Sequence, residues 1–483
     1  MKQVEKEEIM ESEIKLLAMV DHLNAEYNVE LNLIINIGEN EGVELEAILQ
    51  NVQLPKIITT ASDVKLSNLY RNFNMNILSL VLLKQQNMNE SFMALDQLLW
   101  RRHYTPIIFI YKTMESNTIL DIFQKAWQQG HTSVVVWWQN KVFSYNPYPS
   151  IKIKQLETPQ DFMKHLLQQQ NFNKFEIKVP LFHNPPRSFS YVNREGVEIR
   201  TGFFWKTIET FVTSRNGTLQ YEFFDIWSTD LNRETVTDFI MNAGYSFIPT
   251  MVVPKGDFEK SNAIHFAHDY LLTAVGKEIP ENQYLLITFD TELWLMADVI
   301  FIIIFLILLT VKRLYFNIVD ISGCLLCSFK VLIFTYDVIY GCNLSSIYVS
   351  RIYEPDLNTL QDIARTNLRV QVYGLEYDHL MSLENLPKFL YSRMFVGNNT
   401  EFQENRHNLH LPNIITGMED IVEFMLFQQL YMTRPIARYI PESFYSIPLC
   451  IPIPHRSPFL NDFNRKIPFY RAVPKHRLIL KIT

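Results

Sequence analysis

The stretch LWLMADVIFIIIFLILLTV, residues 293–311, is a long apolar run that divides the chain into two parts. Asp298 is the only ionisable residue within it. A helix of about 19 residues is long enough to cross roughly 30 Å of hydrocarbon. The alternative is a helix buried in a globular core, but such helices rarely carry apolar residues on every face. We therefore expect a membrane-spanning helix over residues 293–313, with Trp294 and Asp298 near the lipid headgroups.

A second apolar run, residues 331–350, follows after a short basic connection. Short loops rich in Lys and Arg stay in the cytoplasm, so the loop over residues 314–330, which ends at Lys330, is expected inside the cell. Asp337, near the middle of the second run, costs about 2.5–3.5 kcal/mol in lipid and offsets most of the apolar contribution. We expect this helix to turn its polar side toward other protein or water, as a pore-lining helix does.

The region before the first apolar run begins with an α/β pattern over residues 1–175. Residues 76–83 (NILSLVLL) and 105–113 (TPIIFIYKT) are typical of buried strands, and residues 117–130 (NTILDIFQKAWQQG) have helical spacing. Strands that alternate with helices predict a parallel sheet covered on both faces. We interpret these residues as an amino-terminal α/β domain.

Further α/β segments lie on both sides of the predicted membrane hairpin, over residues 176–292 and 351–483. Residues 203–217 (FFWKTIETFVTSRNG) and 415–432 (ITGMEDIVEFMLFQQLYM) have helical character. Two crossings return the chain to the side from which it left, so both segments are expected outside the cell. The sequons at Asn89, Asn216 and Asn398 are candidate glycosylation sites on that side.

Composition argues against several functional classes. The net charge of −7 comes without a basic stripe, so no nucleic-acid partner is expected. Cys324 and Cys327 form a CxxC without a second pair or a nearby His cluster, so neither a metal site nor a cofactor is expected. A membrane-anchored enzyme is the alternative class, but no nucleophile elbow or phosphate loop supports it. The first fifteen residues, MKQVEKEEIMESEIK, contain no apolar core, so no signal peptide is expected.

The end of the second apolar run has an unusual pattern of small and polar residues: Tyr340, Asn343, Leu344, Ser345 and Ser346. This pattern resembles the end of the pore-lining helix of ionotropic glutamate receptors, which carries a Tyr, an Asn–Leu pair and two small residues. Small residues let helices approach closely, as a gate requires. The resemblance extends over about residues 175–470 and is closest to the divergent insect chemosensory ionotropic receptors.

Three other stretches carry the resemblance: residues 184–211, 260–272 and 354–374. The resemblance implies a bilobed, periplasmic-binding-protein-like ligand-binding domain that is split by transmembrane helices and preceded by a short α/β amino-terminal domain. It also implies a chemosensory subunit of the ligand-gated cation channel family in the plasma membrane, sensing a small extracellular ligand and assembled as a hetero-tetramer with co-receptor subunits.

The same resemblance implies ligand contacts and shows departures. Lys260 occupies the place of the family's ligand-clamping Arg, and Tyr373 and Gly374 match the strand end beside the ligand. The Ser or Thr expected next is replaced by Leu375 and Glu376, and no acidic residue occurs at 428–431. An α-amino acid bound in the family's manner is therefore not expected.

The channel part departs as well. The loop over residues 314–330 is too short for a pore helix and its return strand, so we expect the pore loop to be missing. No further long apolar run follows, so the family's last transmembrane helix is not expected. The alternative function is therefore a non-conducting, membrane-tethered ligand-binding module, or a degenerate receptor of the same family.

Overall fold

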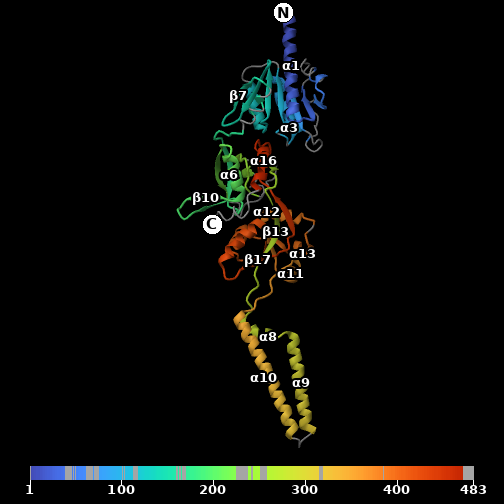
Figure 1. Ribbon diagram of the computed structural model, residues 1–483, viewed down its shortest axis with the longest axis vertical. Helices are drawn as coiled ribbons and strands as arrows, with labels where there is room; N and C mark the ends of the chain where they lie inside the picture. Colours follow the sequence, from blue (N-terminus) through green and yellow to red (C-terminus); the bar gives the residue numbers. More distant parts are fainter. Residues whose placement is uncertain are drawn as a thin grey trace.

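The computed structural model describes most of the chain, and the statements below refer to that part. The described residues are 2–37, 46, 48, 50–60, 69, 76–100, 102, 104–111, 118–158, 161–162, 165, 170–224, 238–240, 243–250, 258–314, 319–384 and 386–471. Within these ranges only the backbone is described for residues 2–10, 308, 311–312, 314, 319–322, 324–326, 375 and 470–471. The described elements form an amino-terminal domain, two lobes and a long helical hairpin (Figure 1).

The amino-terminal domain is built on a seven-stranded sheet of order β2-β1-β3-β4-β5-β6-β7. The strands are β2 (Lys56–Thr59), β1 (Leu31–Ile35), β3 (Ile77–Leu83), β4 (Ile107–Tyr111), β5 (Val134–Trp138), β6 (Lys141–Asn146) and β7 (Lys152–Leu156). The first five are parallel, and β6 and β7 are antiparallel. Helix α1 (Lys2–Glu26) packs on one face, whereas α3 (Met88–Leu99) and α4 (Thr118–Gln128) pack on the other. Because both faces are covered, β1, β3 and β4 are buried along their full length.

Lobe 1 follows the amino-terminal domain and contains short strands around helix α6 (Phe203–Thr213). Its strands are the parallel pair β8 (Glu176–Phe182) and β11 (Thr218–Phe224), the hairpin of β9 (Phe189–Val192) and β10 (Glu198–Thr201), and the antiparallel pair β12 (Phe258–Lys260) and β19 (Pro452–Pro454). Helix α16 (Leu460–Arg471) returns from the end of the chain and shares a buried aromatic core with α6, in which Phe211 and Phe463 meet edge to face at 5.2 Å.

Lobe 2 is a sheet of order β15-β14-β16-β13-β17, with β18 also paired to β13. Its strands are β15 (Met394–Val396), β14 (Val370–Val372), β16 (Ile414–Met418), β13 (His265–Ala274), β17 (Ala437–Tyr439) and β18 (Tyr445–Leu449); its helices are α11 (Leu360–Arg365), α12 (Gly374–Met381), α13 (Lys388–Arg393), α14 (Asn399–His407) and α15 (Glu419–Leu426). Strand β13 pairs with β18 from His265 to Asp269 and with β16 from Asp269 to Leu272. The long strand β13 therefore runs between the two lobes (Figure 1), and β18 pairs with it along His265 to Asp269.

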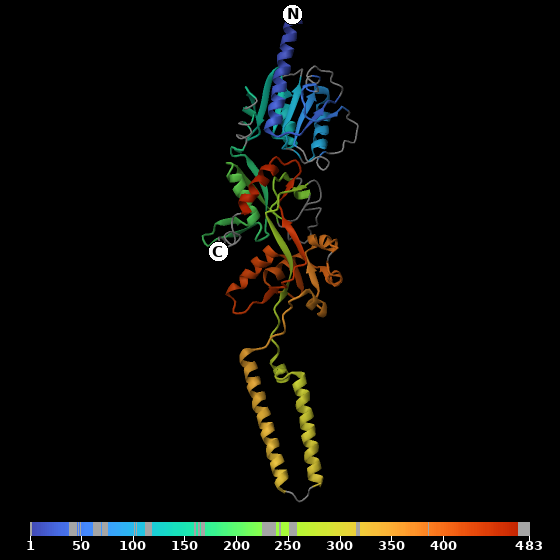
Figure 2. The same ribbon diagram turned by 45° about the vertical axis from the view of Figure 1, so that its right-hand side comes forward.

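The hairpin of α9 (Thr291–Leu314) and α10 (Val319–Ser350) extends from lobe 2, and the short helix α8 (Glu281–Ile287) leads into it (Figure 2). The apolar runs at 293–313 and 331–350 lie within α9 and α10. In the described part of the chain, no helix combines the length and the apolar character that a membrane crossing needs. The predicted loop over residues 314–330 is wrong for residues 319–330, because the apolar sequence there continues α10 without a proline to end it.

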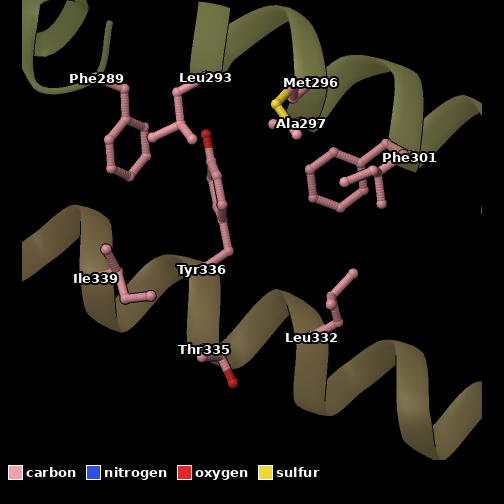
Figure 3. Close-up of a pocket in the computed structure, with 10 residues that line it drawn as sticks. Phe289, Leu293, Met296, Ala297, Phe301, Leu332, Thr335, Tyr336 and Ile339 are labelled. Carbon is pink, nitrogen blue, oxygen red and sulfur yellow. The ribbon is translucent and has the colours of Figure 1, made fainter.

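Helices α9 and α10 leave an apolar pocket of about 280 Å³ between them (Figure 3). The Tyr336 ring lies between the two helices, near Phe289 and Leu293 (Figure 3). Its ring centre is 5.3 Å from that of Phe289 and 5.9 Å from that of Phe301. Aromatic contacts of this kind hold the upper parts of the helices together.

Candidate functional site at the lobe interface

One ion pair joins the two lobes across their interface. Arg187 donates from Nε to Asp420 Oδ2 at 2.7 Å and from Nη2 to Asp420 Oδ1 at 2.9 Å. Arg187 lies in the turn between β8 and β9 of lobe 1, whereas Asp420 lies in the first turn of α15 in lobe 2. The two side chains are 2% and 9% exposed. A buried, bidentate pair of this type is strong and directional, so it defines the relative position of the lobes in this closed arrangement.

The start of α6 holds Arg187 in place. The backbone N–H groups of Phe204 and Trp205 donate to the Arg187 carbonyl at 3.0 and 3.2 Å. Gly202, directly before α6, has a φ of +112°, and an added Cβ there would lie 2.3 Å from the Arg187 carbonyl oxygen. Because this close approach admits only glycine, the α6 terminus determines where the Arg187 backbone lies.

A second buried acid, Asp269, lies on β13 where that strand changes partners. In the ladder it is opposite Met418 of β16 and Tyr445 of β18. Burial, together with the nearby carboxylate of Glu376, raises the pKa of Asp269 well above its ordinary value of 3.8, and Arg187 opposes this rise. Strand β13 therefore carries a carboxyl group that resists ionisation.

Glu376 and Arg406 complete the interface cluster, which we define as Arg187, Asp269, Glu376, Arg406 and Asp420. Burial raises the pKa of Glu376, although the two arginines lower it. Burial also lowers the pKa of Arg406 to about 10, and Glu376 opposes that change. Arg406 consequently stays charged at neutral pH and partly balances the acids of the cluster.

The predicted ligand contacts lie in different places. Tyr373 and Gly374 are at the start of α12, whose first turn carries Glu376, so they lie beside the interface cluster. The Tyr373 ring stacks on Phe402 at 6.1 Å. Lys260 is exposed at the end of β12, and none of the described contacts of the cluster involves it. The arginine that pairs across the lobes is Arg187, and its position after two prolines is the only local sequence signal that distinguishes it.

The predicted gate residues lie on the part of α10 next to α8. Tyr340 Oη donates to the Leu285 carbonyl of α8 at 3.1 Å. Asn343, Ser345 and Ser346 are exposed, and Leu344 is half-buried. The candidate glycosylation sites are also exposed: Asn89 on α3, Asn216 after α6 and Asn398 at the start of α14. The gate and glycosylation roles stay predictions.

We expect Asp269→Asn to raise the free energy of unfolding at about pH 8 and to leave it nearly unchanged at about pH 4. Below the ordinary pKa, both the folded and the unfolded Asp269 are protonated. As pH rises, the Asp269 carboxyl ionises first in the unfolded chain, so the stability of the folded protein falls. The fall ends once pH passes the raised pKa of Asp269 in the folded protein. Glu376 on α12, Asp420 on α15, Tyr445 on β18 and Arg187 face this group and are unchanged in the variant. Urea unfolding across this pH range measures the effect, and a difference independent of pH would contradict it.

Comparisons with known proteins give weak similarities. No protein-family model and no curated protein matches the chain. Among solved structures, the ligand-binding domain of AvGluR1 in complex with phenylalanine has 8% identity and a TM-score of 0.37, covering 64% of this chain and 93% of that one. Its complex with glutamate has 8% identity, a TM-score of 0.36 and the same coverage. The ligand-binding domain of an ionotropic glutamate receptor from Mnemiopsis leidyi, in complex with D-serine, has 9% identity and a TM-score of 0.35, covering 63% and 95%. Similarity at this level does not establish a family.

Proposed function

We propose that this chain is an ionotropic-receptor-like subunit in which a small extracellular ligand binds between the two lobes and changes their separation. The observation that carries the proposal is the Arg187–Asp420 pair, which crosses an interface between lobes connected through β13 and β18. Charged groups regain hydration when such an interface opens, whereas exposure of apolar groups to water raises the free energy. The chemistry of this interface therefore favours reversible opening.

The connections to the hairpin support transmission of that motion. The segment before α8 and the segment after α10 pair through Ile279 N–H to Ile352 O at 3.0 Å and Glu354 N–H to Lys277 O at 2.9 Å. Asp356 Oδ2 accepts from Arg438 of β17 at 2.6 Å. Both connections are thus fastened to lobe 2, and a movement of lobe 2 displaces α9 and α10 together.

We propose that the hairpin lies in the plasma membrane with the lobes outside the cell, although no helix in the described part of the chain has both the length and the apolar character of a membrane crossing. The support is its exposed apolar surface: Ile302, Phe305 and Leu306 of α9 are 58%, 61% and 55% exposed. Water penalises each such side chain by about 1.5–3 kcal/mol relative to burial. The exposed polar groups of α10, such as Asn343, suit contact with helices of further subunits, as in a hetero-tetramer. The chemosensory role rests on the sequence resemblance over about residues 175–470.

A second candidate is a non-conducting binding module with the same ligand-driven motion. The connection between α9 and α10 consists of residues 315–318, which lie outside the described residues. A pore helix with its return strand needs a longer connection than this. In this version of the proposal, lobe closure acts on partner subunits that provide the pore.

The test reconstitutes the full chain into phospholipid vesicles, with spin labels at Val192→Cys in lobe 1 and Tyr431→Cys in lobe 2, both exposed positions, after replacement of the native cysteines. We expect the protein to float with the vesicles and at least one class among amines, carboxylates, amino acids and neutral odorants to shift the distance between labels. A distance that no class changes would overturn the binding role, and protein left in the aqueous fraction would overturn the membrane location. Ligand-evoked current from this chain alone would exclude the non-conducting candidate.

A further inference from the structure

The amino-terminal domain and lobe 1 share a buried aromatic cluster. The two units lie next to each other in both views of the chain (Figure 1, Figure 2). Trp127, in the last turn of α4, packs against the core of the amino-terminal domain and also against the core of lobe 1. Its ring meets Tyr148 edge to face at 5.5 Å and Phe459, directly before α16, at 6.4 Å. A single side chain is therefore part of two cores.

The segment through which the chain enters lobe 1 belongs to the same cluster. The Phe172 ring centre lies 4.7 Å from that of Tyr148 and 5.6 Å from that of Phe459. Tyr148, Phe172 and Phe459 are 4%, 2% and 5% exposed. Ring pairs of this kind are directional as well as apolar. At Phe172 the chain therefore enters lobe 1 through a packed core and not through an open linker.

A second set of contacts joins the same two units at the turn between β19 and α16. Arg456 Nη2 donates to Asp96 Oδ2 of α3, whose side chain is 13% exposed. The ring of His455 lies 5.0 Å from that of Trp100, directly after α3. Gly130, shortly after α4 and with a φ of +80°, comes so close that an added Cβ would lie 2.0 Å from the Arg456 carbonyl oxygen. Contacts from the ends of two helices thus hold one turn of lobe 1.

The same turn is anchored inside lobe 1. His455 Nδ1 lies 3.1 Å from Glu259 Oε1 of β12, and the two side chains are 8% and 7% exposed. Strand β12 pairs with β19, with Phe258 opposite Pro454. A turn that is fixed on both sides leaves little freedom for the amino-terminal domain to rotate against lobe 1.

Two domains of one chain usually move relative to each other unless their interface is extensive and apolar. We propose that the amino-terminal domain and lobe 1 form one rigid unit, held by Trp127, Gly130 and Arg456, and that lobe 2 and the hairpin move relative to this unit when the lobes open. The movement of lobe 2 rests on the proposed function, whereas the rigidity of the junction does not. A subunit that binds the amino-terminal domain therefore holds lobe 1 as well, and lobe 2 is left to move in response to a ligand.

Distances between spin labels in the detergent-solubilised full chain, with the native cysteines replaced, test the rigid unit. Ile58→Cys on β2 with Val192→Cys on β9 reports across the junction, and Ile58→Cys with Ile153→Cys on β7 reports within the amino-terminal domain; these positions are 48%, 67% and 42% exposed. We expect the two distance distributions to have the same width. The distribution between Ile58→Cys and Tyr431→Cys of lobe 2 should broaden when Arg187→Met weakens the lobe contact, whereas the one across the junction should not change.

Gly130→Ala is the variant that should loosen the junction, because its new Cβ meets the backbone of Arg456. We expect it to broaden the distribution across the junction by roughly twofold or more and to leave the one within the amino-terminal domain unchanged. Gly244→Ala is the matched control for backbone strain, because Gly244 also has a positive φ, +68°, but nothing lies within 4 Å of its added Cβ. Unfolding temperatures establish that each variant is folded. If Gly130→Ala does not fold, the two distributions of the parent protein still decide.

Two outcomes would overturn the rigid unit: a broader distribution across the junction than within the amino-terminal domain of the parent protein, or equal widths across the junction in folded Gly130→Ala and Gly244→Ala. Failure of the proposed function gives a different result. If the distribution across the junction is narrow but neither a class of compound nor Arg187→Met alters the distance to lobe 2, the rigid unit stands and the movement of lobe 2 is wrong.

Discussion

Replacing Arg187 by Met is expected to lower the free energy of unfolding of the two-lobed unit by about 3–5 kcal/mol. The substitution keeps an unbranched side chain of similar length but leaves Asp420, 9% exposed in its side chain, as a buried charge without its cation. The loss of stability comes mainly from the buried, unpaired Asp420 carboxylate and less from the lost attraction between the two charges. Urea unfolding of the full chain, followed by circular dichroism at neutral pH, measures the change.

Two further variants define what the Arg187 result means. Arg187→Met combined with Asp420→Leu removes both charges, so we expect most of the lost stability to return. Arg351→Met is the matched control, because Arg351 pairs with Glu278 at 3.2 Å on the surface and its side chain is 63% exposed. An exposed pair contributes about 0–1 kcal/mol. A loss at Arg187 no larger than that at Arg351 would contradict the role of the buried pair.

The sequence predicted those elements whose burial is uniform along the chain. Strands β3 and β4 are buried at every position, so residues 76–83 and 105–113 are continuous apolar runs that can be recognised without tertiary information. The same reasoning failed for residues 319–330. That segment was predicted as a loop because it lies between the two apolar runs and ends at Lys330, but in the structure helix α10 already begins at Val319.

The interface cluster could not be predicted from the sequence, for a different reason. Arg187 and Asp420 are 233 positions apart, and neither has a local pattern that distinguishes it from a solvated surface charge. Their contact depends on how β13 and β18 place one lobe against the other. Tyr373, Gly374 and Lys260 were all predicted as ligand contacts from the family resemblance. Tyr373 and Gly374 lie beside the cluster, whereas Lys260 does not, so alignment with a remote family does not reliably locate a side chain.

Replacing Gly202 by Ala is the second change with a large expected effect, about 3 kcal/mol or more of lost stability, even though the residue carries no charge. Its φ of +112° lies where residues with a Cβ are strained by about 1–3 kcal/mol. The new Cβ would also lie 2.3 Å from the carbonyl oxygen of Arg187, so the turn that carries Arg187 must move. Gly196→Ala is the matched control, because Gly196 also has a positive φ of +79° but nothing lies within 4 Å of its added Cβ.

The Gly202 and Arg187 effects should not add, because displacement of the Arg187 turn already breaks the contact with Asp420. In a double-mutant cycle, Gly202→Ala combined with Arg187→Met is therefore expected to cost less than the sum of the two single changes, by about 1–3 kcal/mol. Gly196→Ala combined with Arg187→Met should be additive, since the β9–β10 turn that contains Gly196 does not hold Arg187. Additive losses for the Gly202 combination would show that α6 does not position the ion pair. A smaller-than-additive loss would connect the start of α6 directly to the lobe interface.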